Sequence, residues 1–123
     1  PLFVCAWLAG KRPASYGDGT QSRDFTFVEN VVRGNLAAAE ASGAEGRVFN
    51  VACGGQQSLL QLIAAINEVL GTHIEPTFEE WRPGDVRESL ADITAARTIL
   101  GYEPTVDFLE GLRRSIEYYR SIG

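Results

Sequence analysis

Residues 16–30 read Tyr-Gly-Asp-Gly-Thr-Gln-Ser-Arg-Asp-Phe-Thr-Phe-Val-Glu-Asn, and they combine the signals of a turn, a strand and the start of a helix. Gly17-Asp18-Gly19 has the composition of a tight turn, because glycine reaches backbone conformations that other residues avoid. The alternation of charged and aromatic residues over 23–27 then predicts a short strand. From Val28 onward, apolar residues recur at helical spacing, which predicts a helix that ends near Ser42-Gly43.

Periodic patterns on both sides of this stretch predict the remaining elements. Further helices are expected at 2–9, 58–70, 92–100 and 107–119, each bounded by a glycine or a capping residue. Further strands are expected at 14–16, 47–52 and 74–78, the last at a sheet edge because of Pro76. These strands are too few and too short for a complete doubly wound sheet. We therefore expect an α/β or mixed α+β subdomain, with four to five helices, that packs on another structure.

Composition and charge exclude several classes of protein. With 123 residues, the chain has room for one domain or less. A net charge of −5 argues against a nucleic-acid partner, which requires clustered lysines and arginines. No window approaches the ~20 apolar residues of a membrane span, and no signal peptide is recognisable. Cys5 and Cys53 have no metal or disulfide spacing, so we expect both to be reduced and buried in a cytoplasmic protein.

The start of the sequence suggests a larger parent protein. The chain contains no methionine and opens inside an apolar run. Residues 2–9 are apolar on every face, which suits a buried helix better than a surface one. We therefore expect that the sequence was cut from something longer.

Searches for catalytic motifs give negative results. A dinucleotide site needs a glycine-rich turn between a strand and a helix, and here Ser22 stands where the third glycine belongs. A Tyr-x-x-x-Lys pair is missing, because Lys11 is the only lysine and Trp7 stands four positions before it. His73, the only histidine, is predicted in a surface loop without partners for a triad or a metal site. The sequence therefore predicts no catalytic residue, no cofactor-binding residue and no metal ligand within the chain.

Two arginines in predicted loops suggest a binding role instead. Arg23 follows the glycine turn, and Arg82 lies in the irregular segment 79–90. A guanidinium group offers a rigid fork of donors that fits phosphate oxygens, so two arginines that converge would clamp a diphosphate. Tyr16, at the end of a strand, would offer its ring to a base. Alternatives stay open at this point, because loop arginines are commonly solvated and a tyrosine in this position also suits a core.

Three segments, in order and at matching spacing, carry a resemblance to a known family. The segments are residues 16–30, then Phe49-Asn50-Val51 with Gly54-Gly55 and Ser58-Leu59, then Arg82–Arg87 continuing through Ser89, Ala91-Asp92 and Leu100-Gly101-Tyr102 to Pro104. They resemble the NAD-dependent epimerase/dehydratase family, the extended short-chain dehydrogenases/reductases. Within it, the third segment resembles UDP-glucose and UDP-N-acetylglucosamine 4-epimerases. UDP-xylose synthases and UDP-glucuronate epimerases are close alternatives.

The resemblance implies a site for the nucleotide half of the substrate. At the matching positions, Ala14-Ser15-Tyr16 would line the uracil, through backbone contacts and the Tyr16 ring. Arg23 and Arg82 would hold the diphosphate, while Asp85 would accept hydrogen bonds from the ribose hydroxyls. Val51 would pack near the nucleotide.

A further position, Ser89, resembles a gate beside the sugar. The resemblance associates a small residue there with acceptance of N-acetylated sugars, so Ser89 favours UDP-GlcNAc and UDP-GalNAc as substrates in addition to UDP-Glc and UDP-Gal.

The resemblance also implies what this chain lacks. In the family, bound NAD removes a hydride from C4 of the sugar and returns it to the other face, while the protein supplies binding, orientation and an acid–base tyrosine. These parts belong to an N-terminal Rossmann domain. Residues 1–123 would then be the C-terminal nucleotide-sugar-binding subdomain, inactive alone, of a homodimeric epimerase. The isolated chain is expected to self-associate, because it would expose a docking surface.

Two other interpretations remain open. The chain would be a free-standing, non-catalytic sugar-nucleotide-binding module, or an interaction domain that keeps only the fold. A related dehydratase or decarboxylase is an alternative parent.

Overall fold

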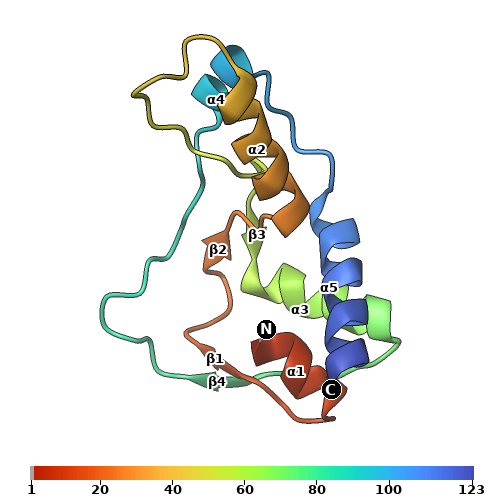
Figure 1. Cartoon of the computed structure of the whole chain (residues 1–123). Helices are drawn as coiled ribbons and strands as arrows, with labels where there is room; N and C mark the ends of the chain where they lie inside the picture. Colours follow the sequence, from red (N-terminus) through yellow and green to blue (C-terminus); the bar gives the residue numbers. More distant parts are fainter. Residues whose placement is uncertain (1) are drawn as a thin grey trace.

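The computed structural model describes residues 2–123, which form five helices and four short strands (Figure 1). In chain order these are α1 (Leu2–Leu8), β1 (Ala14–Tyr16), β2 (Ser22–Arg23), α2 (Val28–Glu40), β3 (Gln57–Ser58), α3 (Leu59–Leu70), β4 (Thr77–Glu79), α4 (Thr94–Leu100) and α5 (Phe108–Ile122). The predicted mixed α/β class with four to five helices is confirmed.

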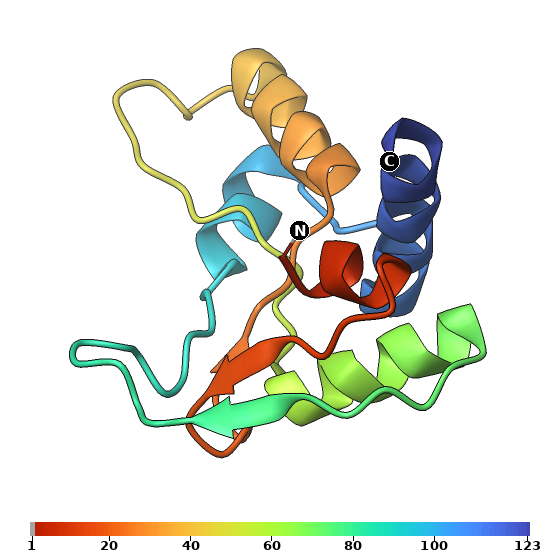
Figure 2. The same cartoon turned by 90° about the horizontal axis from the view of Figure 1, so that it is seen from below.

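The strands form two separate pairs. β1 runs parallel to β4, with Ser15 opposite Phe78 (Figure 2), and β2 runs antiparallel to β3, with Arg23 opposite Gln57. A parallel bridge between Ser22 and Glu88 holds the irregular segment after β4 beside β2. This segment therefore returns to the turn that follows β1.

The larger of two apolar cores lies between α1, α3 and α5. Its buried residues are Val4, Trp7, Ile63, Ala65, Ile66, Leu112 and Ile116. Trp7 Nε1 donates a hydrogen bond of 2.8 Å to Asn67 Oδ1, which ties α1 to α3. As predicted, α3 begins at Ser58, in a reciprocal capping box with Gln61, and ends at Gly71 in the left-handed conformation.

The second core joins α2, α4 and the segments beside them. Its buried residues are Ala52, Ile93, Ala96, Leu100 and Tyr102. The buried Tyr102 hydroxyl donates to the carbonyl of Ala52 at 2.8 Å. Figure 1 shows α2 and α4 at one end of the molecule and α1, α3 and α5 towards the other.

A fully buried asparagine joins the two ends. Asn30 of α2 accepts at Oδ1 from the backbone amides of Thr105 (3.0 Å) and Val106 (3.1 Å). Its Nδ2 donates to the Val106 carbonyl at 2.7 Å. The side chain thus replaces water for backbone groups directly before α5, which positions that helix against α2.

Two strand predictions were wrong, one in part and one entirely. The strand expected at 23–27 is reduced to Ser22–Arg23, and the run at 47–52 is not in a strand. A β-rich run becomes a strand only when another strand accepts its hydrogen bonds, and none within residues 2–123 lies beside it. Val48 in this run is 94% exposed.

Two burial predictions also fail, and the apolar face of α2 lies exposed. α1 is a helix, but only Val4 and Trp7 are buried in it, and Leu2 is 85% exposed. Cys5 is exposed and Cys53 is half-buried, whereas both were expected in the core. In α2 the apolar stripe faces outward: the exposed residues are Val28, Val31, Val32 and Leu36, while Asn30 and Gly34 are buried.

Candidate functional site

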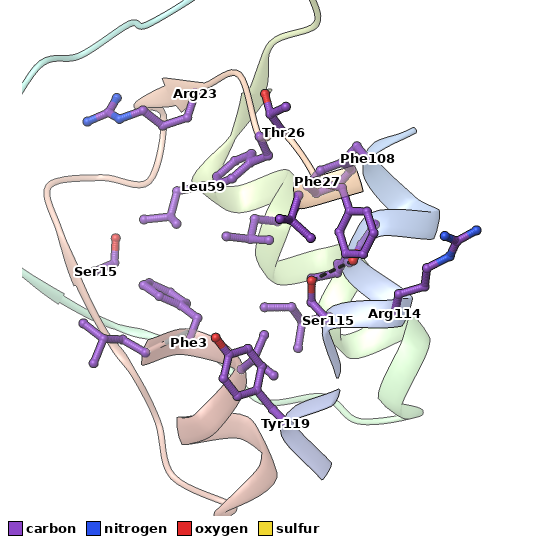
Figure 3. Close-up of a pocket in the computed structure, with 18 of the residues that line it drawn as sticks. Phe3, Ser15, Arg23, Thr26, Phe27, Leu59, Phe108, Arg114, Ser115 and Tyr119 are labelled. Atoms are coloured by element: carbon purple, nitrogen blue, oxygen red, sulfur yellow. Dashed lines mark hydrogen bonds between the residues drawn. The ribbon is translucent and has the colours of Figure 1, made fainter. Parts of the chain in front are cut away.

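A cavity of about 870 Å³ opens between β1, residues 21–28 and helices α1, α3 and α5. Side chains of α3 and α5 make its apolar wall, and Ser15, Gln21, Arg23 and Asp85 lie at its polar side. Figure 3 shows Ser15 and Arg23 along one side, with Arg114 opposite. Small-molecule sites have this size, roughly 300–1,000 Å³, and this combination of apolar walls with a few polar groups.

An ion pair closes one edge of the cavity. Arg23 Nη2, on β2, lies 2.9 Å from Asp85 Oδ1, in the returning segment. Arg23 Nη1 also donates to the carbonyl of Ser22 at 2.7 Å. About a third of each charged side chain is exposed, 33% for Arg23 and 30% for Asp85, so both groups remain reachable by a ligand.

A cation–π pair lies next to this ion pair. The guanidinium carbon of Arg82 is 3.5 Å from the centre of the Tyr16 ring, on β1. The amide of Asp85 donates to the Arg82 carbonyl at 3.1 Å, so one short turn presents both residues. An arginine held over an aromatic face gains electrostatic attraction from the ring. The structure therefore brings Tyr16, Arg23, Arg82 and Asp85 to the contact between two loops, although Arg82 itself does not line the cavity.

Packing of Trp81 on a glycine holds the returning segment in place. Gly17 has φ +90°, and a Cβ there would lie 2.5 Å from Cε2 of Trp81. The guanidinium carbon of Arg87 lies 5.1 Å from the centre of the Trp81 ring, and the Arg87 carbonyl accepts from Ser22 N at 2.8 Å. Sequence reasoning recognised the turn but missed Trp81, because nothing in the sequence joins residue 81 to residue 17.

Asp24 fixes the backbone that follows Arg23. Its carboxylate accepts from the amides of Cys53 (3.1 Å) and Gly54 (2.9 Å). Asp24 thereby ties the backbone after Arg23 to the loop that leads to β3, the partner strand of β2. Arg23 is consequently held on a backbone fixed from two directions.

Gln21 is a second residue that sequence reasoning did not single out. It lines the cavity and is only 8% exposed. Its Nε2 donates to the Tyr16 carbonyl at 2.6 Å, which connects the turn to β1. Its position directly before β2, in the motif quoted first above, was the available signal.

Two further predicted site residues do not line the cavity. Val51 packs its side chain against Gly34 of α2, in the second core, and does not line the cavity. Ser89 is exposed, and its amide donates to the Ser22 carbonyl at 3.1 Å. Ala14, Ser15 and Tyr16 all line the cavity.

The described residues do not fit a dinucleotide. The Gly17–Gly19 turn leads from β1 into β2 instead of into a helix, which is the wrong context for a pyrophosphate cradle. The first amides of α3 are already paired: Leu59 N donates to Gln21 O, Leu60 N to Gly19 O and Gln61 N to Ser58 Oγ. Within residues 2–123 there is no group of three His, Cys, Asp or Glu side chains placed to hold a metal ion. None of the helices described is long and apolar enough to span a bilayer.

Comparison with known proteins identifies the family of this chain. The family model described as GDP-mannose 4,6 dehydratase matches residues 1–115. The chain is 38% identical to the UDP-glucose 4-epimerase of Mycolicibacterium smegmatis over 120 residues, covering 98% of this chain and 38% of that protein. It therefore belongs to the family of GDP-mannose 4,6 dehydratase, whose members include sugar-nucleotide epimerases, dehydratases and decarboxylases.

Solved structures show the same fold. The UDP-glucuronic acid 4-epimerase of Bacillus cereus, in complex with UDP-glucuronic acid and NAD, superposes with a TM-score of 0.94 at 32% identity, over 99% of this chain and 39% of that one. The UDP-N-acetylglucosamine 4-epimerase of Methanobrevibacter ruminantium, in complex with UDP-N-acetylmuramic acid, gives 0.92 at 36% identity, over 100% and 39%. The chain thus spans less than two fifths of the length of these relatives.

Proposed function

We propose that this chain binds the nucleotide half of a UDP-sugar and is the C-terminal subdomain of an NAD-dependent UDP-sugar 4-epimerase. The observation that carries the proposal is the convergence of two arginines. Arg23 and Arg82 come from separate segments of the chain. In the turn 82–85, Arg82 lies over Tyr16 of β1 and Asp85 pairs with Arg23 of β2, beside a cavity of about 870 Å³. Structures of relatives with the same fold are complexes with UDP-sugars, which supports the same ligand class for this chain.

The charges of these side chains suit the parts of a nucleoside diphosphate. Two guanidinium groups match the negative charges of a diphosphate, and both can bind phosphate oxygens bidentately. Without ligand, Arg23 is paired with Asp85 and Arg82 with the Tyr16 ring. On binding, the phosphates replace these partners, and the released Asp85 carboxylate accepts hydrogen bonds from the ribose hydroxyls. Tyr16 then offers its ring to the base.

The redox chemistry belongs to a part of the relatives that this chain does not span. NAD supplies the hydride acceptor and donor when it is bound, and residues 2–123 provide no cradle for it. We assign NAD binding, the acid–base tyrosine and the subunit contacts of a dimer to an N-terminal domain. The share of this chain is to bind and orient the nucleotide.

The choice of sugar is assigned to Ser89. Its side chain is small and exposed beside β2, which leaves room for an N-acetyl group. In a full-length protein that contains this chain, Ser89→Tyr is expected to depress turnover of the N-acetylated substrate selectively. Equal losses on both substrates would contradict this assignment.

Calorimetric titration of the chain with UDP and with uridine tests the binding function. UDP should bind, and Arg23→Ala and Arg82→Ala should each weaken it by roughly 10- to 100-fold, as expected for hydrogen bonds to a charged group. Neither variant should alter the affinity for uridine, which lacks phosphate. Arg97→Ala is the matched control. Arg97 lies on α4, outside the cavity, and pairs with Glu103. Absence of UDP binding, or equal losses in all three variants, would overturn the proposal.

A further inference from the structure

Among residues 2–123, two buried oxygen atoms in the cavity wall have no hydrogen-bond partner. They are Oγ of Ser15 and Oε1 of Gln21, on side chains that are 1% and 8% exposed. Both residues line the cavity, and Figure 3 shows Ser15 at its polar side. Buried polar atoms in folded proteins nearly always have a partner, because removing them from water costs free energy. A pair of them at one cavity therefore points to a ligand.

The orientation of the Gln21 amide is determined by its one contact. The Tyr16 carbonyl can only accept, so the group that lies 2.6 Å from it must be Nε2. The oxygen at the other end of the amide is consequently the unpaired atom, and it can only accept. A ligand that satisfies Gln21 must therefore present a donor.

The Ser15 hydroxyl is less restricted than the Gln21 oxygen, which can only accept. The hydroxyl donates or accepts, and it turns about a single side-chain bond. Ser15 directly precedes Tyr16, whose carbonyl accepts from Gln21, so the Ser15 hydroxyl can donate on the same side of the cavity. The two side chains together suit a planar group in which an N–H stands beside a carbonyl.

We propose that Gln21 and Ser15 bind the imide edge of the pyrimidine base, with Gln21 Oε1 accepting the N3–H and the Ser15 hydroxyl donating to an adjacent ring carbonyl. This inference rests on the proposed function, and assigns the base specificity of that site to two side chains. Gln21 keeps its hydrogen bond to the Tyr16 carbonyl, and the Ser15 hydroxyl turns towards the cavity when the base enters. Uracil and thymine share the imide edge, so this pair accepts both. Cytosine presents a bare N3 acceptor to Gln21, so it is disfavoured.

The chain offers a matched pair of serines for the test. Ser115, on α5, also lines the cavity, but its Oγ already donates to the Gly111 carbonyl at 2.8 Å. Ser15→Ala should weaken UDP binding roughly 3- to 10-fold, the loss expected for one net hydrogen bond. It should leave the melting temperature of the ligand-free chain unchanged or raised, because an unpaired buried hydroxyl is removed. Ser115→Ala should do the reverse, with a lower melting temperature and unchanged UDP affinity.

A ligand without the N3–H tests Gln21 directly. N3-methyl-UDP should bind the unaltered chain at least roughly tenfold more weakly than UDP, and CDP should also bind more weakly. In Gln21→Ala the ratio between UDP and N3-methyl-UDP should fall towards one, because both the acceptor and the steric conflict are gone. 5-Methyl-UDP, which carries the thymine base on an intact ribose, should bind like UDP.

The outcomes separate the two proposals. If the unaltered chain does not bind UDP, the proposed function fails and this inference fails with it. If UDP and N3-methyl-UDP bind equally well, or if Gln21→Ala leaves their ratio unchanged, the base-reading role is overturned while UDP binding stands. If the melting temperature falls in Ser15→Ala as it does in Ser115→Ala, Ser15 has a structural role. That result would overturn the proposal that Ser15 binds the base.

Discussion

Arg23 and Asp85, 62 positions apart in the sequence, form an ion pair of 2.9 Å at the edge of the cavity. The pair joins the end of β2 to the segment that follows β4, so each residue holds the other's loop. In this pair, Asp85 occupies the guanidinium group of Arg23, which we assign to phosphate binding. A carboxylate in that position competes with an anionic ligand.

Removing Asp85 should therefore affect two ligands in opposite directions. Asp85→Ala is expected to raise the affinity for inorganic pyrophosphate by roughly 3- to 10-fold at low salt, because Arg23 is released and a like charge is gone. The same variant should lower the affinity for UDP, which loses the acceptor for its ribose hydroxyls. Titration calorimetry at two salt concentrations measures both. Glu103→Ala removes the same charge from the distant pair with Arg97 and should change neither affinity.

Substitution of Gly17 should release the returning segment. Gly17→Ala places a Cβ against Trp81 at a backbone angle of φ +90°, so strain and overpacking together should cost about 2–4 kcal/mol in free energy of unfolding. Gly43→Ala is the control, because Gly43 has φ +86° but no atom near its Cβ position. It should cost only about 1 kcal/mol, from backbone strain. Chemical denaturation measures the difference, and equal losses would show that contact with Trp81 contributes nothing.

Packing of Val51 on Gly34 should reverse the usual effect of a helical glycine. Gly→Ala inside a helix normally stabilises by about 1 kcal/mol. At Gly34 a new Cβ would lie 2.5 Å from Cγ1 of Val51, so Gly34→Ala should destabilise the chain by about 1–3 kcal/mol. In a Val51→Ala background the same substitution should become stabilising.

A double-mutant cycle of unfolding free energies measures this coupling, and additive effects would contradict it. The UDP affinity of Val51→Ala tests the separate prediction, from the resemblance, that Val51 packs near the nucleotide.

Glu110 gives α5 a pH-dependent contribution to stability. Hydrogen bonds from Arg113 and Arg114 lower the pKa of Glu110 from its ordinary value of 4.5 to about 2. A carboxylate with a lowered pKa in the folded state stabilises fully above its unfolded pKa, and this contribution is lost as the pH falls from about 4.5 to about 2. The effect should be modest and reduced by salt, because these groups are partly exposed.

The comparison of Glu110→Gln with the unaltered chain isolates this group. The melting temperature of the variant should be lower at pH 7, and the difference should shrink between pH 4.5 and pH 2. A difference that stays constant across this range would exclude the ion pairs as its cause.

The apolar face of α2 should make the isolated chain self-associate. Val32 and Leu36 are 49% and 60% exposed, one helical turn apart, and Val28 and Val31 are exposed near them. Exposed apolar patches of this kind favour association. The double variant Val32→Glu/Leu36→Lys keeps the net charge and adds a favourable i,i+4 pair. It should shift sedimentation towards the monomer without lowering the melting temperature, whereas an unchanged distribution would place the contact elsewhere.

Local features were predictable wherever neighbours in the sequence decide them. Ser58 and Gly71 bound α3 as expected, and Asp107 caps α5 by accepting from Glu110 N at 2.8 Å. The turn at Gly17–Gly19 and the strand at 14–16 were likewise correct. Caps and turns depend on side chains a few positions away, so their signals are local.

Features that depend on distant partners were not predictable in the same way. The run 47–52 has the composition of a strand, but strand formation needs a second strand beside it. The periodicity of α2 indicates a helix, yet periodicity does not say which structure covers the apolar face, and here Asn30 and Gly34 face inward instead. The contact of Val51 with Gly34 likewise joins positions far apart in the sequence, while a role of Val51 near the nucleotide stays a prediction.

For the candidate site, the sequence by itself determined the residue types: two arginines, an aspartate and a tyrosine in motifs that resemble one family. Long-range packing brings Arg23 to Asp85 and Arg82 over Tyr16, and it leaves Ser15 and Gln21 with oxygens that have no partner among residues 2–123. The physical reason is the range of the interactions. Capping and periodicity act within a few residues, whereas pairing across 62 positions and the desolvation of a side chain depend on every segment packed around them.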